Sequence, residues 1–182
     1  GGSVRIPAAW NDLVGLKTTS GRLSLDGVVP LSMKFDTVGP LTRSVEDAAV
    51  LLALMEGGTP TDLSNATLEG RNFAIVRTTL MEDLRDAPRA AFQSAVHRLQ
   101  AAGATVEYID VPAVQEALDL SGVLMTSQAY GQWKDVIEAS PDLMYPEILK
   151  RFRLGGLHSA ADYVAAENKL EEARRAYGAA TA

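Results

Sequence analysis

The chain has 182 residues, of which 47% are hydrophobic and 22% are charged, and its formal net charge is −6. These proportions fit an ordinary soluble globular protein. The acidic balance, with no run of lysine or arginine, argues against binding to a nucleic-acid backbone. The absence of cysteine excludes disulfides, thiolate nucleophiles and cysteine-based metal sites.

No apolar run approaches the roughly 18 residues of a membrane span, and no signal-peptide pattern opens the sequence. The lack of cysteine fits a reducing compartment. We therefore predict a cytoplasmic protein that contacts neither membranes nor, directly, nucleic acid.

The opening stretch Gly1–Trp10, GGSVRIPAAW, has two interpretations. Gly-Gly-Ser is a common flexible linker. Two glycines before a serine also let the backbone turn sharply and point N–H groups at one spot, which suits a nucleophile beside an oxyanion hole. Either way, the first forty residues are predicted to form loops and short strands, including a short apolar segment at Val14–Lys17.

A strong helix is predicted to begin after Ser44. The Ser44 side chain is placed to cap the helix, and Asp47 stands at the capping-box position. Asp36, Arg43 and Asp47 are predicted to form a polar cluster at the helix start. Gly57 and Gly58 are predicted to end the helix. The polar stretch 59–69 is predicted to be a surface connection.

The next section has a strand–helix–strand pattern. Asn72–Arg77 is a candidate buried strand, a helix capped by Asp86 follows, Gly103 is a natural stop for that helix, and Thr105–Val111 alternates as a second strand. This order predicts a parallel pair with a crossover helix and therefore an α/β architecture. We expect both strands to belong to one mixed sheet flanked by helices.

The remainder of the chain is predicted to be helical. The first helix spans 113–138 and is expected to break near Gly122 and Gly131. Two further helices are predicted at Pro146–Leu154 and at 159–177, the latter with a capping box formed by Ser159 and Asp162. Tyr130 and Trp133 lie at helical spacing, which favours packing in a core over lining a pocket.

Four linked blocks carry the strongest functional signal. They are GGSVRIPA at the start, VGLK from Val14, the Gly21-Arg22 pair, and DTVGPLTRSVED over Asp36–Asp47. In this order and spacing they closely resemble the amidase signature family, whose members show GGS-[aliphatic]-R-x-P-[AS], GLKPT-x-GR and D-x-x-GPL-x-R-x-x-x-D-A. The resemblance continues more weakly to the stretch Gly155–Tyr163 and is taken to cover the whole chain.

The resemblance implies specific roles. The GGS serine, here Ser3, would be the acyl-enzyme nucleophile. Backbone N–H groups of Gly1, Gly2 and Ser3 would form the oxyanion hole. The family activates its nucleophile through a second serine, in a cis peptide, and a neutral lysine. A lysine can act as a base near pH 7 only if its pKa falls far below its ordinary value of about 10.4.

The sequence also departs from the family pattern. The activating lysine and the bridging serine precede GGS in family members, and this chain begins at Gly1. We therefore expect residues 1–182 to be a single middle segment of an amidase domain that is nearly inactive by itself. Arg5 is expected to be structural near the site, Lys17 is not expected to replace the base, and Thr18 stands where the family usually has proline.

Three functional interpretations remain open. The first is an amidase that hydrolyses a small linear carboxamide through Ser3, without a metal or cofactor. The second is the glutamine-hydrolysing A subunit of a tRNA-dependent amidotransferase. The third is a non-catalytic fragment or structural module. The sequence does not identify substrate-binding residues. Self-association into a homo-oligomer is expected if sheet edges and apolar surface are left uncovered.

Overall fold

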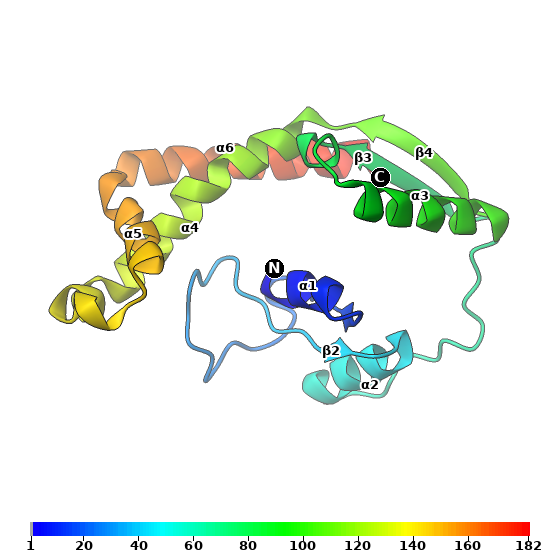
Figure 1. The fold of residues 1–182 in the computed structure, drawn as a ribbon, viewed down its shortest axis with the longest axis horizontal. Coiled ribbons are helices and arrows are strands. Elements are labelled where there is room, and N and C mark those ends of the chain that lie inside the picture. The colour runs from blue at the N-terminus through cyan, green and yellow to red at the C-terminus, as the bar shows by residue number, and fades with distance from the viewer. Residues whose placement is uncertain (1) are drawn as a thin grey trace. The chain divides into compact units, whose positions relative to one another are not determined.

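The computed structural model describes residues 2–182 and contains helices and short sheets in alternation, which is an α/β fold (Figure 1). Residue 1 lies outside the described part. The described chain forms two compact units. One comprises the N-terminal stretch up to Asn65 together with Met125–Leu157, and the other comprises Ala66–Leu124 together with His158–Ala182.

The first unit begins with a helix, α1 (Gly2–Trp10). The prediction of only loops and strands in the first forty residues is therefore wrong at this point. Gly-Gly-Ser and Pro7 are turn signals, and Pro7 cannot donate a hydrogen bond to the carbonyl four residues earlier. The helix forms because its buried side chains, Val4 and Ala8, are one turn apart and pack inward together.

Two short strands follow, β1 (Val14–Gly15) and β2 (Leu41–Thr42), which pair antiparallel with Val14 opposite Thr42. Helix α2 (Val45–Glu56) comes directly after them. Ser44 caps α2 as predicted, because its side chain accepts a hydrogen bond from the backbone N–H of Asp47 at 3.0 Å. Gly57 ends α2 in the left-handed conformation, with φ of 70°.

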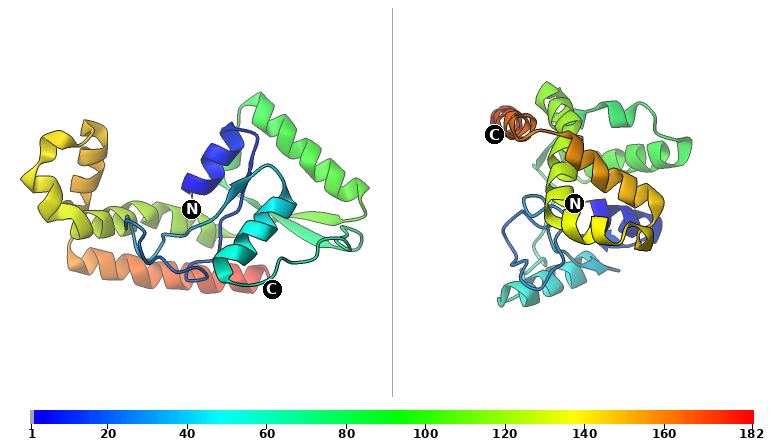
Figure 2. Two further views of the ribbon diagram at one scale, coloured as in Figure 1. Left: turned by 90° about the horizontal axis from the view of Figure 1, so that it is seen from below. Right: turned by 90° about the vertical axis from the view of Figure 1, so that its left-hand side faces the viewer.

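The second unit contains the predicted strand–helix–strand motif: β3 (Asn72–Arg77), α3 (Asp86–Ala101) and β4 (Thr105–Asp110). Strands β3 and β4 are parallel and in full register, from Asn72 opposite Thr105 to Arg77 opposite Asp110. Figures 1 and 2 show α3 running alongside this pair. The parallel pair is confirmed.

Four details of this motif differ from prediction. Strand β3 was predicted to be buried, but all of its residues are exposed or half-buried. Within residues 2–182 the strands form two separate two-stranded sheets, not one mixed sheet. Asp86 does not cap α3; it is the first helical residue, and the cap position belongs to Arg85, without a side-chain capping bond. Strand β4 ends one residue earlier than predicted, because Val111 leaves the ladder and turns into the core.

Helix α4 (Pro112–Ala139) is continuous over 28 residues. The predicted breaks near Gly122 and Gly131 are therefore wrong. A glycine inside a helix costs only about 1 kcal/mol relative to alanine, which the packing of such a long helix readily exceeds. The boundary between the two compact units falls inside α4, after Leu124.

The C-terminal helices are α5 (Pro146–Leu154) and α6 (Ala160–Ala180), with short 3₁₀ turns η1 (Thr79–Met81), η2 (Pro141–Leu143) and η3 (Gly155–Leu157) along the chain. The capping box at the start of α6 is confirmed in both directions, between Ser159 and Asp162. The core of the second unit joins Ala173 of α6 to Val111 and Ala113. No helix within residues 2–182 is long and apolar enough to cross a membrane.

Candidate active site

Helix α1 carries the residues that the sequence singled out. Gly2 is its first residue, Ser3 is its second and has an exposed side chain, and Arg5 follows on the same helix, also exposed. Gly1, the remaining predicted oxyanion residue, lies outside the described residues. The three described residues are thus brought together by one turn of helix.

The start of a helix has a distinctive chemistry. The first four backbone N–H groups have no acceptor within the helix, and the helix dipole makes this end positive. In α1 these groups begin with Gly2 and Ser3. Negative charge that develops beside Ser3 would therefore be stabilised by the dipole at this end of the helix.

Glycine at position 2 is not required by crowding. A Cβ atom added to Gly2 would meet only the side chain of Ile6, at 3.1 Å from its Cδ1 atom, and the Ile6 side chain is itself exposed. A side chain at this position would therefore only require the flexible end of Ile6 to shift by a few tenths of an ångström.

The buried face of α1 packs on β1 at Gly15. A Cβ atom placed on Gly15 would lie 2.7 Å from Ala8 Cβ and 2.7 Å from the Val4 carbonyl oxygen. Real Cβ atoms do not approach other atoms this closely, since carbon atoms prefer separations of about 3.5–4.0 Å. Gly15 is thus the residue that lets the strand touch the helix.

Strand β1 is held from its other side by the Asp36–Asp47 block. The backbone N–H of Leu16 donates to the carbonyl of Pro40 at 3.1 Å. Gly39 lies so close to Leu16 that an added Cβ would overlap the Leu16 carbonyl oxygen. Gly15 and Gly39, which belong to two different motif blocks, are therefore needed for the same reason. Without side chains at these positions, α1, β1 and the strand after Gly39 can pack with their backbones in contact.

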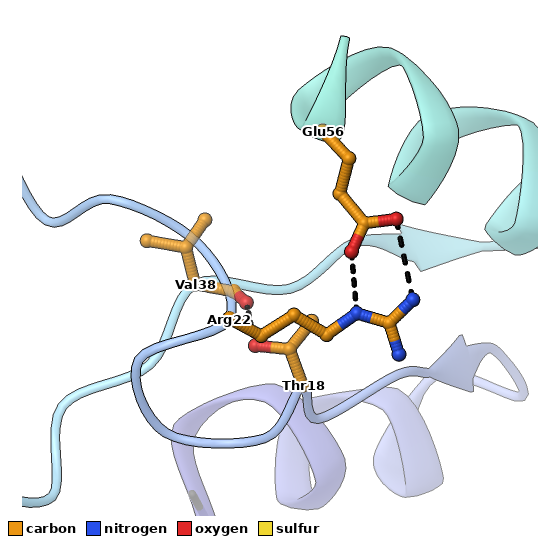
Figure 3. Close-up of polar contacts among 4 residues, drawn as sticks. All are labelled: Thr18, Arg22, Val38 and Glu56. Carbon is orange, nitrogen blue, oxygen red and sulfur yellow. Dashed lines mark hydrogen bonds and ion pairs between the residues drawn. The ribbon is translucent and has the colours of Figure 1, made fainter. Parts of the chain in front are cut away.

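Thr18 adds a contact that the sequence did not predict. Its side chain is buried, and its hydroxyl donates to the carbonyl of Val38 at 2.7 Å (Figure 3). The substitution of threonine for the family's usual proline thus joins the VGLK segment to the Asp36–Asp47 block. The hydroxyl needs a hydrogen-bond partner because the position is buried, and no local sequence pattern reveals that burial.

Arg22, the arginine of the Gly21-Arg22 block, pairs with Glu56 at the end of α2 (Figure 3). The contact is bidentate, with Arg22 Nε on one carboxylate oxygen and Nη2 on the other, the latter at 3.2 Å. The hydrogen bond from Arg22 lowers the pKa of Glu56 below its ordinary value. This pair lies beside a mostly apolar pocket of about 280 Å³ between β1 and α2.

Asp36 has a different place from the predicted polar cluster. Its carboxylate accepts hydrogen bonds from the backbone N–H groups of Leu31 and Ser32, at 2.8 and 3.0 Å, and so closes its own turn. Asp47 instead lies in the first turn of α2, where its backbone N–H donates to the Ser44 hydroxyl. The predicted cluster at the helix start is therefore wrong for Asp36.

The loop of residues 30–36 is tied to α4 by side chains. Ser32 is buried and its hydroxyl donates to Gln128 Oε1 at 2.8 Å. The indole N–H of Trp133 donates to the carbonyl of Pro30 at 2.6 Å. Half-buried Trp133 thus holds a loop, and half-buried Tyr130 packs its ring against Gly156.

Lys17 does not have the surroundings of a catalytic base. Its side chain is exposed, and its ammonium group donates to the carbonyl of the next residue, Thr18, at 2.5 Å. A lysine becomes a base near neutral pH through burial or neighbouring positive charge.

Within residues 2–182, no group of three or more His, Asp or Glu side chains is arranged to hold a metal ion.

The comparisons with known proteins agree with this arrangement of motifs. The Amidase family model matches residues 1–181. The chain therefore belongs to the amidase family.

Individual relatives cover several activities. The chain is 37% identical over 142 residues to the A subunit of glutamyl-tRNA(Gln) amidotransferase from Lysinibacillus sphaericus, a match that covers 71% of this chain and 29% of that protein. It is 33% identical over 168 residues to 2-amino-5-chloromuconic acid deaminase of Comamonas testosteroni, covering 90% of this chain and 36% of the relative. The chain thus spans about a third of the length of these relatives.

Solved structures share the fold. The crystal structure of an amidase superposes with a TM-score of 0.85 at 29% identity, covering 97% of this chain and 40% of that one. The A subunit of glutamyl-tRNA(Gln) amidotransferase from Thermotoga maritima gives a TM-score of 0.70 at 26% identity, covering 96% of this chain and 40% of that one.

Proposed function

We propose that the protein is an amidohydrolase that cleaves the carbon–nitrogen bond of a linear carboxamide, with Ser3 as the nucleophile. The observation that carries this proposal is the position of Ser3. Ser3 is exposed in the first turn of α1, and the first N–H groups of a helix, which have no acceptor within it, suit the binding of a developing negative charge. Membership of the amidase family supports the same assignment.

The reaction has two steps. In the first, Ser3 Oγ attacks the amide carbonyl carbon, the carbon–nitrogen bond breaks, and the serine proton passes through a base to the leaving amine. In the second, water attacks the acyl ester, which releases the acid and restores the serine. The carbonyl oxygen carries negative charge in both transition states, and we assign its stabilisation to the backbone N–H groups of Gly2 and Ser3, together with Gly1.

The base must take the proton of Ser3 Oγ. The surroundings of Lys17 do not support that role. Resemblance to the family assigns it to a lysine acting through a second serine, both of which stand before GGS in family members. The protein to be tested is therefore the longest gene product that contains these 182 residues.

A second candidate is the glutamine-hydrolysing subunit of a tRNA-dependent amidotransferase. The identity of 37% over 142 residues to such a protein favours it. The two candidates share the chemistry at Ser3 and differ in the substrate. Release of ammonia from free glutamine favours the amidotransferase, whereas turnover of simple carboxamides without glutamine turnover favours the amidase.

The lack of cysteine leads us to propose a cytoplasmic location for either.

The experiment compares hydrolysis of a chromogenic amide by the parent protein, by Ser3→Ala and by Ser121→Ala. Ser121 lies exposed on α4 and donates to the carbonyl of Leu118 within the same helix, so it is a matched control. We expect Ser3→Ala to lose activity by a factor of about 10⁴ or more, because nucleophile and base act as one unit, and Ser121→Ala to keep it. Substantial turnover by folded Ser3→Ala would overturn the proposal.

A further inference from the structure

The contact between α1 and β1 is unusually close, and it lies directly beside Ser3. The carbonyl oxygen that faces Gly15 belongs to Val4, the residue after Ser3, and the methyl group that faces it belongs to Ala8, one turn further on. Both helical residues are deeply buried, with 7% and 2% of their surface exposed. This face of α1 therefore rests on the strand at Gly15, while Ser3 is exposed to solvent.

The strand cannot easily yield to the helix. Gly15 pairs with Leu41 in the two-stranded sheet, and the next residue, Leu16, is bound to Pro40 and crowded by Gly39. One residue beyond Lys17, Thr18 is tied to Val38. If a side chain were added at Gly15, α1 is the part that would have to move.

The size of this movement follows from the distances. An added methyl group would lie 2.7 Å from Ala8 Cβ, whereas two carbon atoms pack at about 3.5–4.0 Å. Relief of the contact needs a shift of about 1 Å. Because α1 is a short helix of nine residues, the shift is carried to its first turn, where Ser3 lies.

We infer that Gly15 is a positioning residue for the reaction: the absence of its side chain fixes the depth of α1 on β1 and thereby places Ser3. This inference rests on the proposed function, because it concerns the nucleophile assigned there. A misplacement of about 1 Å at a reacting group can lower the rate about 10²-fold. Such an effect appears in kcat, since the substrate's other contacts are unchanged.

The test separates positioning from folding by counting active sites. Gly15→Ala and the control Gly131→Ala are titrated with a fluorophosphonate, and kcat is expressed per labelled site. A Cβ on Gly131 meets nothing within 4 Å. We expect Gly15→Ala to lose about 10²-fold in kcat per labelled site with little change in KM, and Gly131→Ala to match the parent.

If Gly15→Ala gives no labelled sites, the double variant Gly15→Ala/Ala8→Gly is measured. This variant removes the clash with the Ala8 methyl group and keeps the clash with the Val4 carbonyl oxygen. Its kcat per labelled site is expected to stay below that of the parent. A kcat per site equal to the parent's, in the single variant or in this one, would overturn the positioning role. Labelling of the parent away from Ser3 would instead overturn the proposed function.

Discussion

At the scale of single residues, Glu56 has a titration that the structure makes testable. Its pKa lies below the ordinary value of 4.5, chiefly because Arg22 donates a hydrogen bond to the carboxylate. A carboxylate with a lowered pKa contributes stability above its ordinary pKa, and that contribution is lost as the pH falls through the folded-state value. The pair therefore stabilises the protein at neutral pH and ceases to do so in acid.

We expect carbon-detected NMR to show Glu56 titrating below pH 4.5 in the parent and moving up towards the ordinary value in Arg22→Gln. The slope of unfolding free energy against pH, in the acid range, should be shallower in that variant. An unchanged Glu56 titration in Arg22→Gln would contradict the assignment of the shift to this pair.

Gly39 offers a second test at this scale. Its Cβ would overlap the Leu16 carbonyl oxygen, which is backbone and cannot rotate away. We expect Gly39→Ala to lower the free energy of unfolding by about 1–3 kcal/mol, the range seen for overpacked sites. Gly122→Ala is the matched control, because nothing lies within 4 Å of its Cβ and alanine favours the helix by up to about 1 kcal/mol. Urea unfolding that ranks the two variants in the opposite order would refute this account.

At the scale of elements, helix α6 depends on its capping box. The Ser159 hydroxyl accepts from the backbone N–H of Asp162 at 3.1 Å, and the Asp162 carboxylate accepts from the backbone N–H of Ser159 at 2.8 Å. We expect Ser159→Ala to cost about 1 kcal/mol of unfolding free energy. Ser121→Ala, the same change inside α4, should be neutral or slightly stabilising. Equal effects of the two changes would show that the cap contributes nothing.

The elements also show what the sequence could and could not predict. Strand β3 and helix α5 have the predicted bounds, because both carry local signals. The strand is a short, mainly apolar run between polar residues, and the helix begins at Pro146. Helix α1 was missed, because its helicity depends on packing Val4 and Ala8 against strand β1 at Gly15, a contact between two elements that no pattern within the helix itself reveals. The glycines of α4 gave false breaks, because local preference there is weaker than packing.

The candidate site was assigned from the sequence alone. Ser3 and its neighbours were singled out because an ordered series of motifs surrounds them, and their catalytic role stays a prediction. Gly15 and Gly39 are needed because of close contacts between elements, and Thr18 forms a hydrogen bond between two segments, so these roles become visible only in the folded structure.

At the scale of the whole molecule, much apolar surface is uncovered. Helix α2 exposes Val45, Leu54 and Met55 by 57%, 66% and 41%, while Ala48 and Ala53 are buried. A helix that is apolar on all sides is normally covered on all sides. We expect sedimentation velocity of the 182-residue chain to show concentration-dependent association, which Leu54→Lys should weaken. A compact monomer at all concentrations would contradict this expectation.

The central claim is that Ser3 is the acylated residue, and one measurement tests it most directly. The longest gene product that contains these residues is treated with a fluorophosphonate, digested, and mapped by mass spectrometry, with amide turnover followed in parallel. We predict a single adduct on Ser3 that grows in proportion to the activity lost, and no adduct in Ser3→Ala. An adduct on another residue that accounts for the lost activity, or complete inactivation with Ser3 unmodified, would contradict the account.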